Sequence, residues 1–280
     1  MAGRFDGLNS EQWEVLAPIF GQPEDSEAIR RRGRPPVNRR YVLNTILYVL
    51  ITSCPWCYVP IGEQWAKRST AHFYLGTWAE DGTFLKLKDS LLEIADLNNL
   101  IDWERGSADG SFSAGKGGGD DVGYGFKGKG VTRHTYVDGN GMPLAIITTS
   151  ANVDERTQVI KLLDSVSVKG NRVRAKSCTA TIQLDGGYPA KWLKIALRKK
   201  GIQPVIAEKV YKNRKQKSGR KAPKQIDRYK VERYFAWSQT KFRRLTNKWE
   251  RRRRYWEGFV LLSMSLVWFA RLGQKGVFAA

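Results

Sequence analysis

Apolar residues recur at helical spacing from the start of the chain. Trp13, Leu16 and Phe20 form a stripe with intervals of three and four residues. Asn9 stands before this stripe as a candidate helix cap, and Gln12 is placed to reach back to it in a capping box. The pattern therefore predicts a first helix that begins just after Asn9.

Three further helices are predicted before the pattern changes. Apolar residues keep helical spacing over 39–52, Thr70 is placed to cap a short helix that ends at Trp78, and 85–97 forms the last one. Basic residues and prolines at 30–36 separate the first two helices. Short helices joined by tight turns are compatible with a helix-turn-helix that reads DNA, and also with a helical bundle of another function.

Strands begin near residue 105. Segments 108–113, 131–137 and 144–149 read as strands. The sequence Asp-Gly-Asn-Gly at 138–141 lies between the last two, and this turn signal predicts a hairpin. Asp138 is therefore interpreted as a turn residue.

Helices and strands then alternate. A helix over 154–166, a strand that ends at Asp185 and a helix over 189–200 precede a basic helix. This order indicates an α/β fold with a mixed sheet flanked by helices. We therefore expect a small all-helical region over 1–102 and an α/β domain with basic C-terminal helices over 103–280.

The chain is strongly basic. Lys and Arg number 48 against 27 Asp and Glu, which gives a net charge of +21 and indicates a polyanionic partner. Many basic residues lie between Lys209 and Arg254, where aromatic residues are interleaved with them. A disordered tail would rarely carry so many aromatic residues, so we expect a folded surface that binds nucleic acid. The aromatic residues can stack on exposed bases or pack the helix onto the sheet. We expect packing for most of Phe235, Trp237, Phe242 and Trp249.

Composition also bears on the compartment. Three cysteines do not make a disulfide framework in a chain of 280 residues, and no apolar signal core stands near the N-terminus. The longest apolar stretch, 259–270, is shorter than the roughly 20 residues that cross a bilayer, so it predicts a buried helix. We expect a cytoplasmic protein.

Two short motifs indicate chemistry only weakly. Cys54 and Cys57 have the spacing of a redox or zinc motif, but the remaining candidate ligands are distant in sequence, so a helix-ending turn is favoured. The stretch 123–130 nearly spells a phosphate-binding loop but lacks the final Ser or Thr. We expect 115–130 to be a flexible loop whose lysines can touch phosphate.

Three acids stand in local settings that suit a two-metal site. Asp109 lies in the first predicted strand, Asp185 ends a later one, and Glu232 lies near the start of the basic helix. Cleavage of a phosphodiester requires an activated nucleophile and a stabilised leaving oxygen, and two Mg²⁺ ions supply both. Mg²⁺ prefers carboxylate oxygens, which strands and helices hold rigidly. Each acid also has an ordinary explanation, as a turn residue or in a surface ion pair, so only the three together indicate a site.

Eight short motifs form a series that covers nearly the whole chain. They are Gly-Arg-Pro-Pro at 33–36, Ile-Leu-Tyr-Val-Leu at 46–50, Cys-Pro-Trp at 54–56, Trp-Ala-Glu-Asp-Gly at 78–82, Asp-Gly-Ser-Phe at 109–112, Val-Asp-Gly-Asn-Gly-Met-Pro-Leu at 137–144, Asp-Gly-Gly-Tyr at 185–188 and Arg-Tyr-Lys-Val-Glu-Arg-Tyr-Phe-Ala-Trp at 228–237. With this series the chain resembles a DDE transposase of a bacterial insertion sequence, in the insertion sequence 5 family, which is related to the insertion sequence 4 group.

The resemblance implies an RNase H-like catalytic domain in which Asp109, Asp185 and Glu232 bind metal and catalyse the reaction. It implies Mg²⁺, for which Mn²⁺ can substitute, and cutting and joining at the terminal inverted repeats of the element's own double-stranded DNA. A homodimer on DNA is expected. Arg228 matches an arginine that related transposases carry four residues before the glutamate.

Two positions depart from the related pattern. Gln225 stands where a tyrosine is frequent, and Gln239 stands where a lysine is frequent. Other basic residues are therefore expected to hold DNA. The residues expected to contact DNA are Arg228, Lys241, Arg243, Arg244, Arg251, Arg252, Lys127, Lys129, Arg34 and Arg39.

The sequence leaves two other functions open. A non-catalytic DNA-binding protein derived from a transposase would bind DNA in a salt-sensitive way without cutting it. A general RNase H-like nuclease would cut DNA or RNA without preference for inverted repeats.

Overall fold

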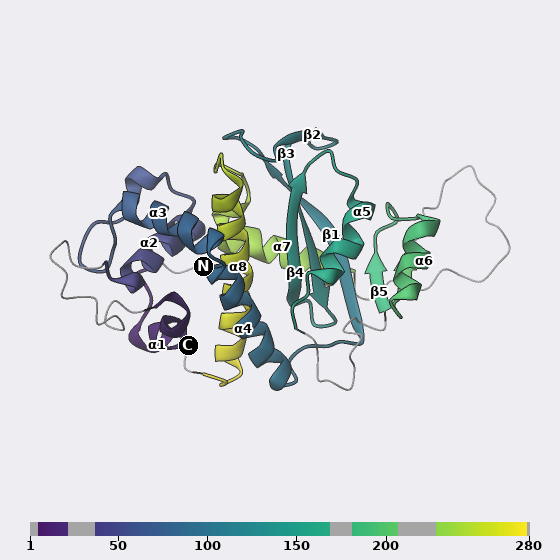
Figure 1. The fold of residues 1–280 in the computed structure, drawn as a ribbon, viewed down its shortest axis with the longest axis horizontal. Coiled ribbons are helices and arrows are strands. Elements are labelled where there is room, and N and C mark those ends of the chain that lie inside the picture. The colour runs from purple at the N-terminus through teal and green to yellow at the C-terminus, as the bar shows by residue number, and fades with distance from the viewer. Residues whose placement is uncertain (1–4, 22–36, 169–180, 207–227, 279–280) are drawn as a thin grey trace. The chain divides into compact units, whose positions relative to one another are not determined.

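The computed structural model describes residues 5–21, 37–168, 181–206 and 228–278. Figure 1 shows the order of the helices and strands along the chain. Arg34 and Gln225, which were singled out from the sequence, lie outside the described residues.

The chain divides into two compact units by packing. The first consists of Met1–Leu91, Ser113–Asp121 and Ser238–Ala280, and the second of Leu92–Phe112 and Val122–Trp237. This division differs from the boundary expected after residue 102, because the C-terminal helix packs against an N-terminal one. The first unit contains α1 (Ser10–Phe20), α2 (Arg39–Thr52), η3 (Trp56–Tyr58), α3 (Arg68–Glu80), most of α4 (Thr83–Leu97), η5 (Arg243–Leu245) and α8 (Arg253–Gln274).

The start of α1 confirms the predicted capping box. The backbone N–H of Gln12 donates to Asn9 Oδ1 at 2.7 Å, and the backbone N–H of Asn9 donates to Gln12 Oε1 at 3.1 Å. These two bonds satisfy N–H groups that the helix itself cannot pair.

The predicted cap of α3 is wrong. The helix begins at Arg68, so Thr70 lies inside its first turn. The reason is a tertiary contact just before the helix, where the backbone N–H of Ala66 donates to Thr45 Oγ1 of α2 at 2.9 Å. That bond holds the chain on α2 and lets the helix begin earlier than the local sequence suggests.

Helix α8 supplies the core of the first unit. Trp256, Phe259 and Trp268 are fully buried on it. Gly258 allows close packing, because a Cβ there would lie 3.1 Å from Leu75 and 3.2 Å from Phe84. The apolar stretch predicted to be a buried helix is therefore part of this core. Among the described residues, no helix has the length and apolar character needed to span a membrane.

The second unit is built on a mixed sheet with the strand order β2-β3-β1-β5-β6, in which β4 pairs with β3. The β1–β5 and β5–β6 pairs are parallel, whereas β2–β3 and the predicted β3–β4 hairpin are antiparallel. This arrangement confirms the predicted α/β class. The strands are β1 (Arg105–Ala114), β2 (Gly123–Gly125), β3 (Gly128–Asp138), β4 (Pro143–Ser150), β5 (Thr181–Leu184) and β6 (Gln203–Ile206).

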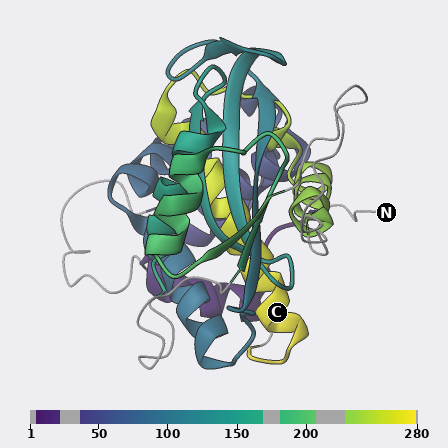
Figure 2. The same cartoon turned by 90° about the vertical axis from the view of Figure 1, so that its right-hand side faces the viewer.

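Helices cover both faces of this sheet. Figure 2 shows α5 (Glu155–Asp164) and α6 (Lys191–Lys199) on one face and α7 (Tyr229–Lys241), drawn in yellow-green, on the other. Helix α7 buries Val231, Tyr234 and Phe235. The opposite side of its first turns, which carries Glu232, is exposed.

The stretch 115–130 is not the flexible loop that was expected. It contains β2, which pairs with the start of β3. Alternating glycines hid this strand, because glycine is depleted in strands and the local pattern resembles a loop. The same pairing confirms that the stretch is not a phosphate-binding loop, since β3 rather than a helix follows it.

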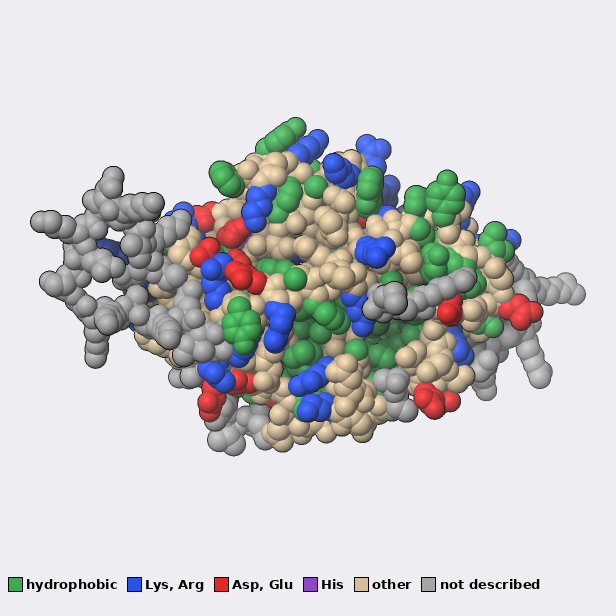
Figure 3. Space-filling view, turned by 180° about the vertical axis from the view of Figure 1, so that it is seen from behind, with side chains coloured by type: hydrophobic (Ala, Val, Ile, Leu, Met, Phe, Trp, Pro, Cys, Tyr) green, Lys and Arg blue, Asp and Glu red, His purple; other side chains and the backbone are tan. Residues whose placement is uncertain are grey.

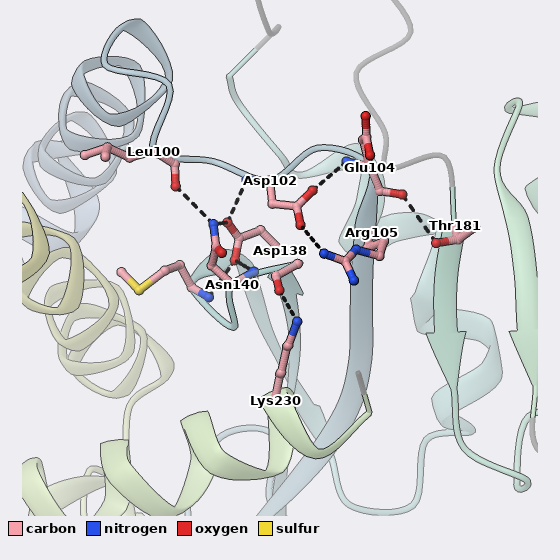
Figure 4. A network of polar contacts seen from close by, with 10 residues as sticks. Leu100, Asp102, Glu104, Arg105, Asp138, Asn140, Thr181 and Lys230 are labelled. Atoms are coloured by element: carbon pink, nitrogen blue, oxygen red, sulfur yellow. Dashed lines mark hydrogen bonds and ion pairs between the residues drawn. The ribbon is translucent and has the colours of Figure 1, made fainter. Parts of the chain in front are cut away.

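Asp138 organises the turn between β3 and β4, as the sequence predicted. It is fully buried, and its carboxylate accepts backbone N–H bonds from Asp102 at 3.0 Å, Asn140 at 2.9 Å and Met142 at 2.7 Å. Figure 4 shows this network. Burial raises the pKa of Asp138 to about 6, although the three donors oppose the shift.

Replacing Asp138 by Ala should leave three backbone N–H groups without their acceptor. We expect a loss of about 3 kcal/mol in the free energy of unfolding, measured by denaturant titration. Asp138→Asn should lose less, because its amide oxygen can still accept from Asn140 and Met142. The exposed ion-pair variant Asp164→Ala serves as the control, and an equal loss in that variant would contradict the proposed role of Asp138.

Candidate active site

Asp109 lies in the middle of β1, the strand between β3 and β5 in the sheet. Its side chain is 18% exposed, and the backbone N–H of Gly110 donates to Oδ1 at 2.8 Å. Burial raises the pKa of Asp109 to about 6, with smaller upward contributions from Glu155 and Asp185. Gly110 and Arg228 lower it, but not enough to compensate. The positive charge of Arg228 therefore does not offset the effect of burial on the pKa of Asp109.

Asp185 follows β5 directly, and strand pairing brings it beside Asp109. The parallel register aligns Ser107 with Gln183, and both acids lie two residues farther along their strands. Residues two apart on a strand point to the same face. A turn closes immediately after Asp185, because the backbone N–H of Tyr188 donates to its carbonyl oxygen at 2.9 Å.

Glu232 lies in the first turn of α7, and Arg228 directly precedes that helix. Their spacing of four residues places them on one side of the helix. The Arg228 guanidinium lies 2.9 Å from Glu232 Oε1, 3.6 Å from Asp185 Oδ1 and 4.0 Å from Asp109 Oδ2. The structure thus gathers the three acids predicted from the sequence around a single cation.

Two observations bear on whether these acids suit a metal ion. Their donor atoms are carboxylate oxygens, which hard divalent cations prefer. Burial also leaves Asp109 with a raised pKa despite Arg228, so an additional positive charge would be favourable. In the described part of the chain no group of three or more His, Cys, Asp or Glu residues is already spaced to hold an ion. The donor atoms therefore suit a divalent cation by their chemistry, but their spacing in this structure is not that of a metal site, and Arg228 provides the positive charge between them.

Glu155 and Tyr188 join this group without having been predicted. Tyr188 Oη donates to Glu155 Oε2 at 2.9 Å. The Glu155 carboxylate also approaches β1, since a Cβ on Gly110 would lie 2.7 Å from Glu155 Oε1. Tyr188 belongs to the Asp-Gly-Gly-Tyr motif, which gave some signal. Glu155 gave none, because acids are common in the first turn of a helix.

The β3–β4 turn holds α7 on both sides of Glu232. Lys230 Nζ donates to the carbonyl oxygen of Gly139, which Figure 4 shows, and Arg233 Nη2 donates to that of Asn140 at 3.3 Å. The buried face of α7 sets the helix against the sheet, and these two bonds restrain its position along the sheet. The turn therefore helps to place Glu232.

The residues expected to contact DNA differ in accessibility. Lys127 and Lys129 are exposed at the β2–β3 hairpin, and Arg243, Arg251 and Arg252 are exposed in the first unit. Figure 3 shows Lys and Arg side chains, in blue, at many places on one face of the molecule.

Three other basic residues are engaged within the first unit. Arg39 is partly buried and lies 4.1 Å from the centre of the Tyr74 ring. Lys241 is partly buried, and burial lowers its pKa. Arg244 is buried and paired with Glu250 at 2.6 Å, which argues against the expectation that it contacts DNA.

The four aromatic residues for which packing was considered divide equally. Phe235 and Phe242 are buried, as expected. Trp237 and Trp249 are exposed, so the expectation of packing is wrong for them. A helical repeat cannot decide these cases, because the ends of α7 and the turn before α8 depend on tertiary neighbours.

Known families match both parts of the chain. Residues 81–268 match the family described as "Transposase DDE domain", and residues 8–88 match the family described as "Putative transposase of IS4/5 family". The first match includes Asp109, Asp185, Arg228 and Glu232 and agrees with an RNase H-like arrangement of the mixed sheet.

Two relatives come from Burkholderia cepacia. The "Putative transposase for insertion sequence element IS402" is 36% identical over 139 residues, which cover 49% of this chain and 62% of the relative. The "Insertion element IS402 uncharacterized 16.2 kDa protein" is 28% identical over 116 residues, which cover 41% of this chain and 78% of that protein. The chain thus spans less than two thirds of the first relative. Since the DDE domain match covers more than half of the chain, the protein belongs to the DDE transposase family.

Proposed function

We propose that the protein is a DNA transposase that cuts DNA at the ends of an insertion sequence and joins the freed 3′ ends to target DNA. The observation that carries the proposal is the convergence of Asp109, Asp185 and Glu232 on the Arg228 guanidinium within 4.0 Å. Membership of the DDE family supports a DNA substrate and the use of divalent metal.

Asp109, Asp185 and Glu232 would hold Mg²⁺, for which Mn²⁺ can substitute. When bound, the metal ions activate the attacking oxygen and stabilise the leaving oxygen of the phosphodiester. Strand pairing places the two aspartates, and the β3–β4 turn holds the helix that supplies Glu232. Arg228 balances the carboxylates in their metal-free form and can turn to a DNA phosphate when metal replaces its charge.

Exposed basic residues of each unit would contact DNA phosphates. In the second unit these are Lys127 and Lys129, and in the first unit Arg243, Arg251 and Arg252. Arg39 and Lys241 are partly buried, so their contacts would be limited. We propose that the N-terminal helices read the terminal inverted repeat, and that a homodimer brings the two ends of the element together.

Replacing Asp109 or Asp185 by Ala should abolish nicking of DNA that carries the terminal repeats. We expect the rate to fall by roughly three orders of magnitude or more, with DNA affinity nearly unchanged. The measurement is single-turnover nicking with Mg²⁺ and with Mn²⁺, alongside binding by fluorescence anisotropy. Asp164→Ala, a change of an exposed acid in the same unit, should leave both unchanged.

Three outcomes would contradict the proposed reaction. Retained Mg²⁺-dependent nicking in both aspartate variants would remove these acids from the chemistry. Salt-sensitive binding by the unmodified protein without cleavage in either metal would indicate a non-catalytic DNA-binding protein. Cleavage without preference for inverted repeats would indicate a general nuclease.

The raised pKa of Asp109 predicts a link between pH, metal and stability. The folded protein holds this proton more tightly than the unfolded chain, because the pKa rises from 3.8 to about 6. Without metal, the free energy of unfolding should therefore fall as pH rises from 3.8 to about 6, because the unfolded chain gives up the Asp109 proton before the folded protein does. Above about pH 6 the whole of this contribution is lost. Asp109→Asn should remove this dependence and raise the Tm above pH 6.

Saturating Mg²⁺ should reverse the effect in the unmodified protein. We expect the Tm at pH 7.5 to rise by a few degrees, which corresponds to about 2.7 kcal/mol at a metal concentration of 100 times Kd. Thermal unfolding with and without Mg²⁺ measures this shift. An equal rise in Asp109→Asn would mean that the metal binds elsewhere.

A further inference from the structure

The tip of the β2–β3 hairpin exposes two aromatic side chains. Tyr124 is 76% exposed and Phe126 is 105% exposed. Lys127 and Lys129 beside them are exposed as well. Figure 1 places this hairpin at the top of the sheet, and Figure 3 shows hydrophobic and basic side chains next to one another along the top edge.

Packing on the other face of the hairpin forces Tyr124 outward. A Cβ on Gly123 would lie 2.1 Å from Ser150 Oγ, and one on Gly125 would lie 2.2 Å from the carbonyl oxygen of Ala151. That face therefore has no room for side chains. Because successive residues of a strand alternate between faces, Tyr124 must point to solvent.

The turn itself does not require an aromatic residue. Phe126 and Lys127 connect the paired residues Gly125 and Gly128. Gly128, with φ of 106°, supplies the backbone conformation that side chains disfavour. Short hairpin turns ordinarily use Asn, Asp or Gly, so Phe126 meets no need of the turn. A fully exposed Phe is instead suited to a partner.

We propose that this hairpin engages DNA by stacking Phe126, supported by Tyr124, on a base that has left the duplex stack, while Lys127 and Lys129 contact the adjacent phosphates. The inference rests on the proposed function, which supplies the DNA. Aromatic rings stack on any base, and the two lysines match the charge of the backbone. An apolar pocket on another protein would accept the rings but would leave the lysines without a counter-charge.

Stacking requires an unpaired or unstacked base, so the contribution of Phe126 should depend on the DNA. The probes are an intact 30-base-pair duplex and the same duplex with one unpaired 2-aminopurine. Binding of the full chain is measured by anisotropy in EDTA, which removes cleavage from the readout. We expect Phe126→Ser to weaken binding to the bulged duplex about tenfold and to the intact duplex less than twofold.

Matched variants separate stacking from charge and from loss of structure. Phe126→Trp should retain the affinity and the quenching of 2-aminopurine fluorescence that Phe126→Ser loses. Lys127→Ala should weaken binding to both duplexes alike and reduce the salt dependence by about one ion. Phe73→Ser, which changes an exposed phenylalanine of the first unit, should have no effect on the preference between duplexes.

The inference would be overturned if Phe126→Ser bound the bulged duplex as tightly as the unmodified protein does. A loss of self-association in Phe126→Ser, measured by sedimentation, with DNA binding unchanged, would also overturn it, because the hairpin would then serve a protein contact. Failure of the proposed function appears separately, as absence of Mg²⁺-dependent nicking by the unmodified protein.

Discussion

In the second unit, one guanidinium lies among three carboxylates and offsets their mutual repulsion. Asp109, Asp185 and Glu232 belong to three different elements, and their like charges would repel one another without a cation among them. Arg228 supplies that cation from the turn directly before the helix that carries Glu232. The compensation is incomplete for Asp109, because burial still raises its pKa. Arg228 therefore keeps the three acids close together, and an additional positive charge near Asp109 would still be favourable.

Two backbone features place these charges. Parallel pairing of β1 with β5 aligns Asp109 and Asp185 by register alone. Strand pairing does not set the position of helix α7, which lies on one face of the sheet. The β3–β4 turn supplies that restraint through Lys230 and Arg233, and buried Asp138 stabilises the turn. A turn residue distant from the acids thus contributes to where Glu232 lies.

The excess of basic residues has more than one role. Arg244 forms a buried pair with Glu250, and Lys248 is buried with its ammonium donating to the carbonyl oxygen of Glu250. Such residues stabilise the first unit and are not available to a polyanion. Exposed residues such as Arg251 remain available to DNA. Net charge therefore indicates the class of partner, while burial decides which residues can meet it.

Local patterns were sufficient for much of the fold. Side-chain periodicity and turn chemistry predicted α1 with its Asn9 cap, the β3–β4 hairpin and the alternation of helices and strands. The series of motifs identified Asp109, Asp185 and Glu232 as candidates. Spacing along the chain determines these features, so they can be read without knowing what any residue touches.

Contacts between distant segments decided the rest. The sequence did not reveal that α8 belongs with the N-terminal helices, that Glu155 approaches Gly110 next to Asp109, or that Arg244 is buried. It also missed β2, whose glycines are required because the residues at and just after the end of β4 leave no room for side chains there. Burial and pairing depend on neighbours remote in sequence, whereas periodicity depends on neighbours along the chain. For that physical reason the sequence determined which elements and acids this protein has, and only the tertiary structure decided which side chains meet and which remain exposed.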